Sequence, residues 1–225
     1  MGRQPGKFYN SPPPRGQTDR QITGRKLLLV EGPDDIYFFN ALLTEMGADL
    51  NDIQVMDYEG KTRLPAVLSL LMRAPEVEAG EVTAIGLVQD ADGDLAAAKG
   101  NIDSAWARVG LDVAPYGAFG VSLVRPNLSI GSFALPDCAT SGDLDEMLFA
   151  SVAGDAAHTA TGVFMGSVGL APAPKFYKRS TQVYLAAKPD LCRGSGRGAE
   201  NGYFDLAAPG LGAIRQFVTT LMATA

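Results

Sequence analysis

The chain has 225 residues, 46% of them hydrophobic and 20% charged, the composition of a globular protein that can bury a core. No apolar stretch approaches the roughly 20 residues that cross a bilayer. The polar start predicts no signal peptide, so we expect a cytoplasmic protein without a membrane partner. One histidine, His158, and two distant cysteines, Cys138 and Cys192, exclude a zinc site with several His or Cys ligands and disfavour a histidine-based hydrolase.

The formal net charge of −6 conceals a segregation of charge along the chain. Residues 1–26 and residues 171–197 each carry six Lys or Arg side chains against one Asp, whereas residues 27–170 are acidic. An acidic centre between basic segments suits a metal site whose surroundings hold a polyanion. Chance segregation on solvated faces explains the pattern equally well.

Regular structure is expected after a mobile tail at residues 1–24, which is rich in proline and glycine. Short apolar runs predict buried parallel strands, and Pro33 is well placed to begin a helix. The elements expected in chain order are strand 26–30, helix 33–46, strand 53–58, helix 63–73, strand 82–89 and helix 95–109. This alternation predicts an α/β, Rossmann-like fold in which helices flank both faces of a parallel-type sheet.

The second half of the chain predicts a strand pair and then helices. The expected strands are 119–124 and 128–135, and the expected helices are 144–152, 175–188 and 211–222. The glycine-rich segment 194–198 follows no strand and is interpreted as a loop. We therefore expect a core at 25–135 and a C-terminal helical extension, 136–225, packed on the same domain.

Carboxylates follow two of the predicted strands. Glu31 comes directly after the first strand, and Asp90, Asp92 and Asp94 come after the third. The carboxyl ends of parallel strands share one edge of a sheet, where open α/β sheets bind ligands. Carboxylates this close repel one another unless a cation neutralises them, and oxygen ligands without His or Cys favour Mg²⁺ or Mn²⁺. Taken singly, each of these residues is better explained as a helix cap or turn residue.

Two motifs at these strand ends resemble those of the Toprim domain. They are LLVEGPDD at 28–35 and DADGD at 90–94, and the resemblance covers residues 26–135. This domain is shared by topoisomerases, primases, a small ribosomal-RNA maturation nuclease and the OLD-family nucleases. The whole body is similar to small stand-alone Toprim-related proteins of unknown function. The shared features are Asp57-x-x-Gly60-Lys61, the segment 144–148, a lysine-bearing helix that ends at 184–186, and the segment 202–205.

The resemblance implies roles for individual residues. Glu31 would act as general acid/base or metal ligand, Asp90 and Asp92 as Mg²⁺ ligands, and Asp94 as an outer ligand. The family's later acidic pair corresponds to Asp145 and Glu146, in reversed order, so which of them faces the site stays open. The remaining candidates are Lys175 or Lys178 as the lysine that stabilises the transition state, and Asp35, Lys61 and Arg179 as substrate contacts.

Elimination among Toprim activities favours hydrolysis. The chain has no room for a separate topoisomerase domain that carries a nucleophilic tyrosine, and too few Cys and His for the zinc module of a primase. The expected function is thus a Mg²⁺- or Mn²⁺-dependent nuclease acting on DNA or RNA, with one or two metal ions. The alternatives are a non-catalytic, metal-dependent binding module for nucleotides or nucleic acid, and a small nucleotide phosphohydrolase. A homo-oligomer and a partner protein in a defence or toxin system stay open.

Overall fold

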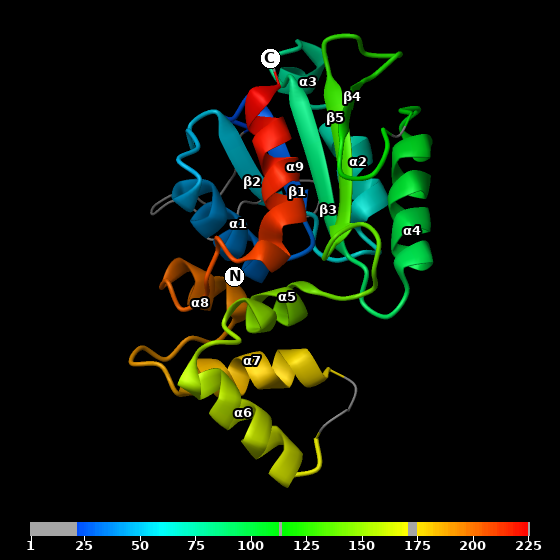
Figure 1. Cartoon of the computed structure of the whole chain (residues 1–225). Helices are drawn as coiled ribbons and strands as arrows, with labels where there is room; N and C mark the ends of the chain where they lie inside the picture. Colours follow the sequence, from blue (N-terminus) through cyan, green and yellow to red (C-terminus); the bar gives the residue numbers. More distant parts are fainter. Residues whose placement is uncertain (1–21, 113, 171–174, 225) are drawn as a thin grey trace, which may run out of the picture.

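The computed structural model describes residues 22–112, 114–170 and 175–224 (Figure 1). Five strands form one sheet in the order β2-β1-β3-β5-β4. The first four of these run parallel, and β4 pairs antiparallel with β5. The strands are β1 (Lys26–Val30), β2 (Ile53–Asp57), β3 (Ala84–Asp90), β4 (Phe119–Val121) and β5 (Ser129–Leu135). Most of the tail predicted at residues 1–24 lies outside the described residues.

Apart from the short α3, the helices follow the predicted pattern through the first half of the chain. Their bounds are α1 (Pro33–Glu45), α2 (Leu64–Leu71), α3 (Pro75–Glu78), α4 (Leu95–Arg108), α5 (Leu144–Ser151), α6 (Ala156–Ser167), α7 (Phe176–Ala186), α8 (Ser195–Glu200) and α9 (Gly212–Ala223), with a 3₁₀ turn η1 at Pro209–Leu211. The sequence predicted neither α3 nor α6. The loop expected at 194–198 is also wrong, because these residues belong mainly to α8, which packs closely on α1.

Alternate residues along the strands feed two hydrophobic cores, one on each face of the sheet. Leu28 and Val30 pack into the core shared with α1, α5, α8 and α9. Leu27 and Leu29 pack into the core shared with α2, α3 and α4. Successive side chains of a strand point to opposite faces, so a strand that is apolar throughout requires cover on both. The predicted α/β fold, with helices on both faces and a C-terminal helix, is confirmed.

The C-terminal part of the chain contributes to both the core and the functional edge. Helix α9 lies across the sheet over β3 and β5, and the main-chain oxygen of Met222 near its end accepts a hydrogen bond of 2.7 Å from Lys26 Nζ of β1 (Figure 1). Helices α5, α6 and α7 lie beyond the carboxyl ends of the strands (Figure 1). These ends therefore face a helical layer formed late in the sequence.

Candidate functional site

The parallel pairing of β1 with β3 brings the two predicted acidic strand ends together. Leu29 pairs with Leu87, so Glu31, directly after β1, and Asp90, the last residue of β3, lie at the same edge. Asp90 Oδ1 accepts a hydrogen bond of 3.2 Å from the main-chain N–H of Leu144, the first residue of α5. The edge is thus tied directly to the helical layer beyond it.

Glu31 presents a buried oxygen without a hydrogen-bond partner. Its Oε2 is the only buried side-chain N or O atom of the described residues that lacks one. Glu31 lines a small hollow together with apolar residues and three polar ones, namely Val30, Phe39, Val88, Leu135, Asp35, Gln89 and Asp90. Burial raises the pKa of Glu31, against the opposing effect of Lys61. A buried acceptor without a donor is costly, and a cation would satisfy it, so this atom fits a metal-binding role.

Lys61 lies among the carboxylates rather than outside them. Its Nζ donates a hydrogen bond of 2.9 Å to the main-chain oxygen of Asp90, contacts Asp92 Oδ2 in an ion pair, and lies 3.9 Å from Glu31 Oε2. Burial opposes the lysine charge, but the hydrogen bond to Asp92 and the surrounding carboxylates raise the pKa of Lys61 overall. Lys61, which the sequence predicted as a substrate contact, therefore forms ion pairs with two of the expected metal ligands.

Asp92 and Asp94 have different environments despite their spacing. Asp92 adopts a left-handed conformation with φ of 49°, and its side chain is 61% exposed. Asp94 is the N-cap of α4, and its Oδ1 accepts a hydrogen bond of 2.9 Å from the N–H of Ala97. The structure thus gives Asp94 a helix-capping contact, whereas the Asp92 carboxylate stays near Lys61 and Glu31.

Asp35 adds a further carboxyl to this edge. Its Oδ2 accepts a hydrogen bond of 2.7 Å from the N–H of Gly32 at the start of α1. Burial, reinforced by the charges of Glu31, Asp34 and Asp145, raises the pKa of Asp35 to about 7. Burial, together with the charges of Asp35, Glu31, Asp143 and Asp92, raises the pKa of Asp90 well above its ordinary value. At neutral pH the edge therefore holds more negative potential than it can stabilise without cations or protons.

The helical layer separates the two residues of the later acidic pair. Burial raises the pKa of Asp145 to about 6, and the nearby Ser195 hydroxyl opposes this shift. Glu146 instead hydrogen-bonds to Tyr177 of α7. The charge of Asp145 acts on Asp35, so Asp145 is the member of the pair that belongs electrostatically to the edge.

Among the basic candidates of α7, Lys178 is the one that acts on the site. Its charge lowers the pKa of both Glu31 and Asp145. Lys175 is the exposed residue that precedes α7, with φ of 61°, and the Arg179 side chain is also exposed. The choice between the two lysines, which the sequence left open, therefore favours Lys178.

Sequence reasoning missed two groups at this site. Asp143 caps α5, and its charge raises the pKa of both Asp90 and Asp145. Its spacing to Glu146 is the recognisable signal of a helix start. Ser195 donates a hydrogen bond of 2.7 Å to Asp34 Oδ2, which links α8 to the first turn of α1. No sequence signal predicts this contact, because it joins distant parts of the chain.

The described residues do not form a completed metal cage. Across 22–112, 114–170 and 175–224, no three His, Cys, Asp or Glu side chains are grouped so that they could hold a metal ion. In this conformation Lys61 lies between the carboxylates of Glu31 and Asp92. The carboxylate oxygens of the edge are ligands of the kind that Mg²⁺ or Mn²⁺ prefers. As the side chains are positioned here, however, they bind the ammonium group of Lys61 instead.

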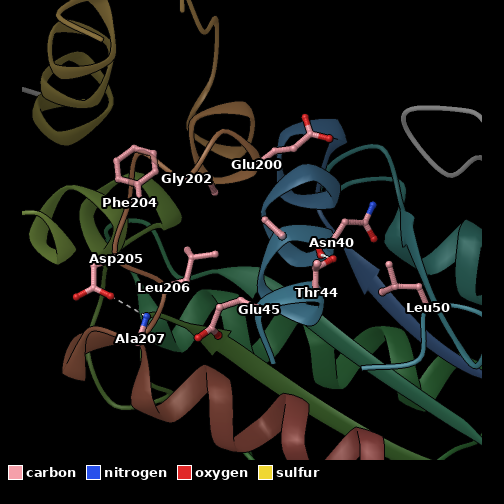
Figure 2. Close-up of a pocket in the computed structure, with 12 residues that line it drawn as sticks. Asn40, Thr44, Glu45, Leu50, Glu200, Gly202, Phe204, Asp205, Leu206 and Ala207 are labelled. Carbon is pink, nitrogen blue, oxygen red and sulfur yellow. Dashed lines mark hydrogen bonds between the residues drawn. The ribbon is translucent and has the colours of Figure 1, made fainter. Parts of the chain in front are cut away.

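A separate hollow of about 670 Å³ lies between α1, α8 and the segment that precedes η1 (Figure 2). Asn40, Leu50 and Asp205 are among its lining residues, together with Glu45, which pairs with Arg215. Figure 2 shows Asp205 turned toward the main-chain N–H of Ala207, with which it forms a hydrogen bond. None of the site residues predicted from the sequence lines this hollow.

Together, the fold and the edge define a Rossmann-like α/β protein with a carboxylate-rich site at the ends of adjacent parallel strands. The chain belongs to the family described as "Protein of unknown function (DUF3226)", which matches residues 25–222. No curated protein and no solved structure matches the chain. No helix in the described part of the chain is long and apolar enough to span a bilayer.

We expect metal-free protein to lose stability as the pH rises from about 4, near the ordinary pKa of Asp, to about 7. Over this range folded Asp35 retains a proton that the unfolded chain releases, so deprotonation favours unfolding. Urea unfolding in chelator at several pH values measures the slope of the free energy of unfolding against pH. Asp35→Asn should reduce it, whereas Glu78→Gln, at an exposed site on α3, should not. An unchanged slope in Asp35→Asn would contradict the expectation.

Gly196→Ala is expected to destabilise the protein by about 2–3 kcal/mol, because the added methyl group would overlap the main-chain oxygen of Asp34 in α1. Gly100→Ala is the matched control. No atom lies within 4 Å of the added methyl group at this helical position, so a gain of about 0.5–1 kcal/mol is expected. Chemical unfolding of both variants measures the difference. Equal stabilities would show that α8 is not closely seated on α1.

Proposed function

We propose that the chain is a Mg²⁺- or Mn²⁺-dependent phosphodiester hydrolase that acts on nucleic acid through a Toprim-like acidic site and works in the cytoplasm. The observation that carries the proposal is the buried, unpartnered Oε2 of Glu31 at the strand end beside Asp90. The absence of any nearby histidine agrees with hydrolysis by metal-activated water, since that chemistry needs no histidine base.

Glu31, Asp90 and Asp92 are the residues proposed to hold the metal. A bound divalent cation supplies Lewis acidity and lowers the pKa of coordinated water. Asp94, as a helix cap, is a weaker candidate for the outer ligand role that the resemblance implied. Asp145 lies on α5 beyond the strand ends and is a candidate to extend the site.

The protein's own side chains would contribute proton transfer and charge stabilisation. In the other role that the resemblance implied, with Asp90 and Asp92 holding the metal, the raised pKa of Glu31 suits a general base. Lys178, exposed on α7 and acting on Glu31, is placed to stabilise negative charge on a phosphoryl group. Its exposure also leaves it accessible to a polyanionic substrate.

The direct test is to incubate purified protein with labelled single- and double-stranded DNA, RNA and tRNA in Mg²⁺, Mn²⁺ or chelator. Cleavage that requires the divalent cation and is lost in Asp90→Asn supports the proposal. Cleavage that persists in chelator, or equally in the variant, would assign the activity to another site or to a contaminant.

A second candidate is a non-catalytic module that binds nucleotides or nucleic acid through a metal. The position of Lys61 favours it, because this ammonium lies among the carboxylates that catalysis would use. Binding that is lost in chelator, without turnover of any nucleic acid, would support this alternative. The third alternative is a small nucleotide phosphohydrolase. Incubation with a panel of free nucleotides, with detection of released phosphate, distinguishes it from a nuclease.

A further inference from the structure

The turn after β2 directs Lys61 into the acidic edge. Glu59 and Gly60 both adopt left-handed conformations, with φ of 62° and 93°. The N–H of Gly60 donates a hydrogen bond of 2.9 Å to the main-chain oxygen of Glu31, so the turn is fastened to the end of β1. The lysine therefore begins next to the residue whose carboxylate it approaches.

The ammonium group of Lys61 is surrounded mainly by oxygen atoms of the protein. Of the three donors on a lysine, one is used on the main-chain oxygen of Asp90 and one on Asp92 Oδ2. The third side faces Glu31 Oε2 at 3.9 Å, and the lysine side chain is only 30% exposed. This arrangement partly offsets the negative charge of Glu31 and Asp92 and leaves little of the ammonium free for an incoming phosphate.

We propose that Lys61 is the resident counter-ion of the acidic edge: it keeps the carboxylates of Glu31 and Asp92 in place without a divalent cation, and must withdraw when one binds. The inference rests on the metal site of the proposed function. An ammonium and a divalent cation a few ångströms apart repel each other strongly, which disfavours both at the same carboxylate oxygens. Each metal-binding event therefore includes the displacement of Lys61.

This arrangement makes the metal affinity of the protein lower than its ligands alone would give. If the withdrawn position of Lys61 is a minor state, the apparent affinity falls in proportion to its population. Removing the ammonium should remove this penalty. We expect Lys61→Gln to bind Mn²⁺ about tenfold more tightly than the wild type, as for a withdrawn state populated at about a tenth.

The experiment measures Mn²⁺ binding to the full chain by loss of the paramagnetic resonance signal of free Mn²⁺, without any nucleic acid. Lys61→Arg retains the charge and should keep affinity close to that of the wild type. Lys188→Gln is the matched control, because it removes a lysine that pairs with Asp155 at 2.6 Å, away from the edge, and should change nothing. In chelator at pH 8, Lys61→Gln should melt at a lower temperature than the wild type, and Mn²⁺ should restore it.

The outcomes separate this inference from the proposed function. If Lys61→Gln binds Mn²⁺ more tightly than the wild type, and Lys61→Arg and Lys188→Gln do not, the counter-ion role of Lys61 is supported. Unchanged or weaker binding, with wild-type binding intact, overturns the counter-ion role and leaves the metal site standing. Binding by Lys61→Gln but not by the wild type supports the counter-ion and contradicts a metal-dependent hydrolase. No Mn²⁺ binding by either protein overturns both.

Discussion

Glu31→Gln is expected to lower metal-dependent cleavage of nucleic acid by about 10²- to 10⁴-fold, the range associated with loss of a positioned general base. The amide retains the size of the side chain but cannot accept a proton and is a poorer ligand for a hard cation. Because Oε2 of Glu31 has no hydrogen-bond partner, the substitution breaks no hydrogen bond of that atom and removes only its long ion pair with Lys61, at 3.9 Å. The loss should therefore appear in turnover rather than in folding.

Single-turnover cleavage rates in Mn²⁺ measure this effect, with melting temperature recorded for each protein. Glu78→Gln makes the same chemical change on α3, at an exposed position, and should retain full activity. A Glu31→Gln protein that folds and cleaves within threefold of the wild type would remove Glu31 from the mechanism. Equal losses in both variants would point to a general effect of charge.

Phe217→Ala is expected to lower the free energy of unfolding by about 3–5 kcal/mol, the usual cost of truncating a buried aromatic side chain. Phe217 lies fully buried on α9 and stacks on Phe119 of β4 with ring centroids 4.8 Å apart, and it also contacts Phe133 of β5. Gly86 of β3 leaves room for this cluster, since an added methyl group there would lie only 3.1 Å from the Phe119 ring.

Urea denaturation at pH 7 measures the change, with the unfolding slope compared between proteins. Thr219→Ala is the control on the exposed face of the same helix, and it should change the free energy by no more than about 0.5 kcal/mol. A loss below about 1 kcal/mol in Phe217→Ala would mean that α9 is not an integral part of the core.

Local sequence signals were enough to predict the sheet and its acidic edge. The apolar run at Lys26–Val30 indicated a strand covered on both faces, and Pro33 indicated the helix start that the structure has. Right-handed connections then placed Glu31 near Asp90, without knowledge of any side-chain contact. These features follow from periodicity and chain geometry alone.

The features that could not be predicted depend on tertiary contacts. Helix α8 contains Gly196 and Gly198, which disfavour a helix locally. It forms because Gly196 allows close approach to α1, and Gly198 allows close approach to Leu185 and Phe204. Which lysine of α7 acts on Glu31 depends on how that helix is rotated against the sheet. The position of Lys61 depends on the left-handed conformation of Glu59, which cannot be predicted from the sequence because glutamate rarely adopts it.

The position of α9 in the chain has a consequence for folding during synthesis on the ribosome. All five strands are synthesised before α9, yet its Phe217 packs on Phe119 and Phe133. Until that helix emerges, an aromatic patch on the nascent sheet has no cover from it, the kind of surface that invites aggregation. Lys26 of the first strand likewise cannot form its hydrogen bond to the main-chain oxygen of Met222 until α9 has been synthesised. Completion of the fold therefore depends on the synthesis of α9, which comes after all five strands.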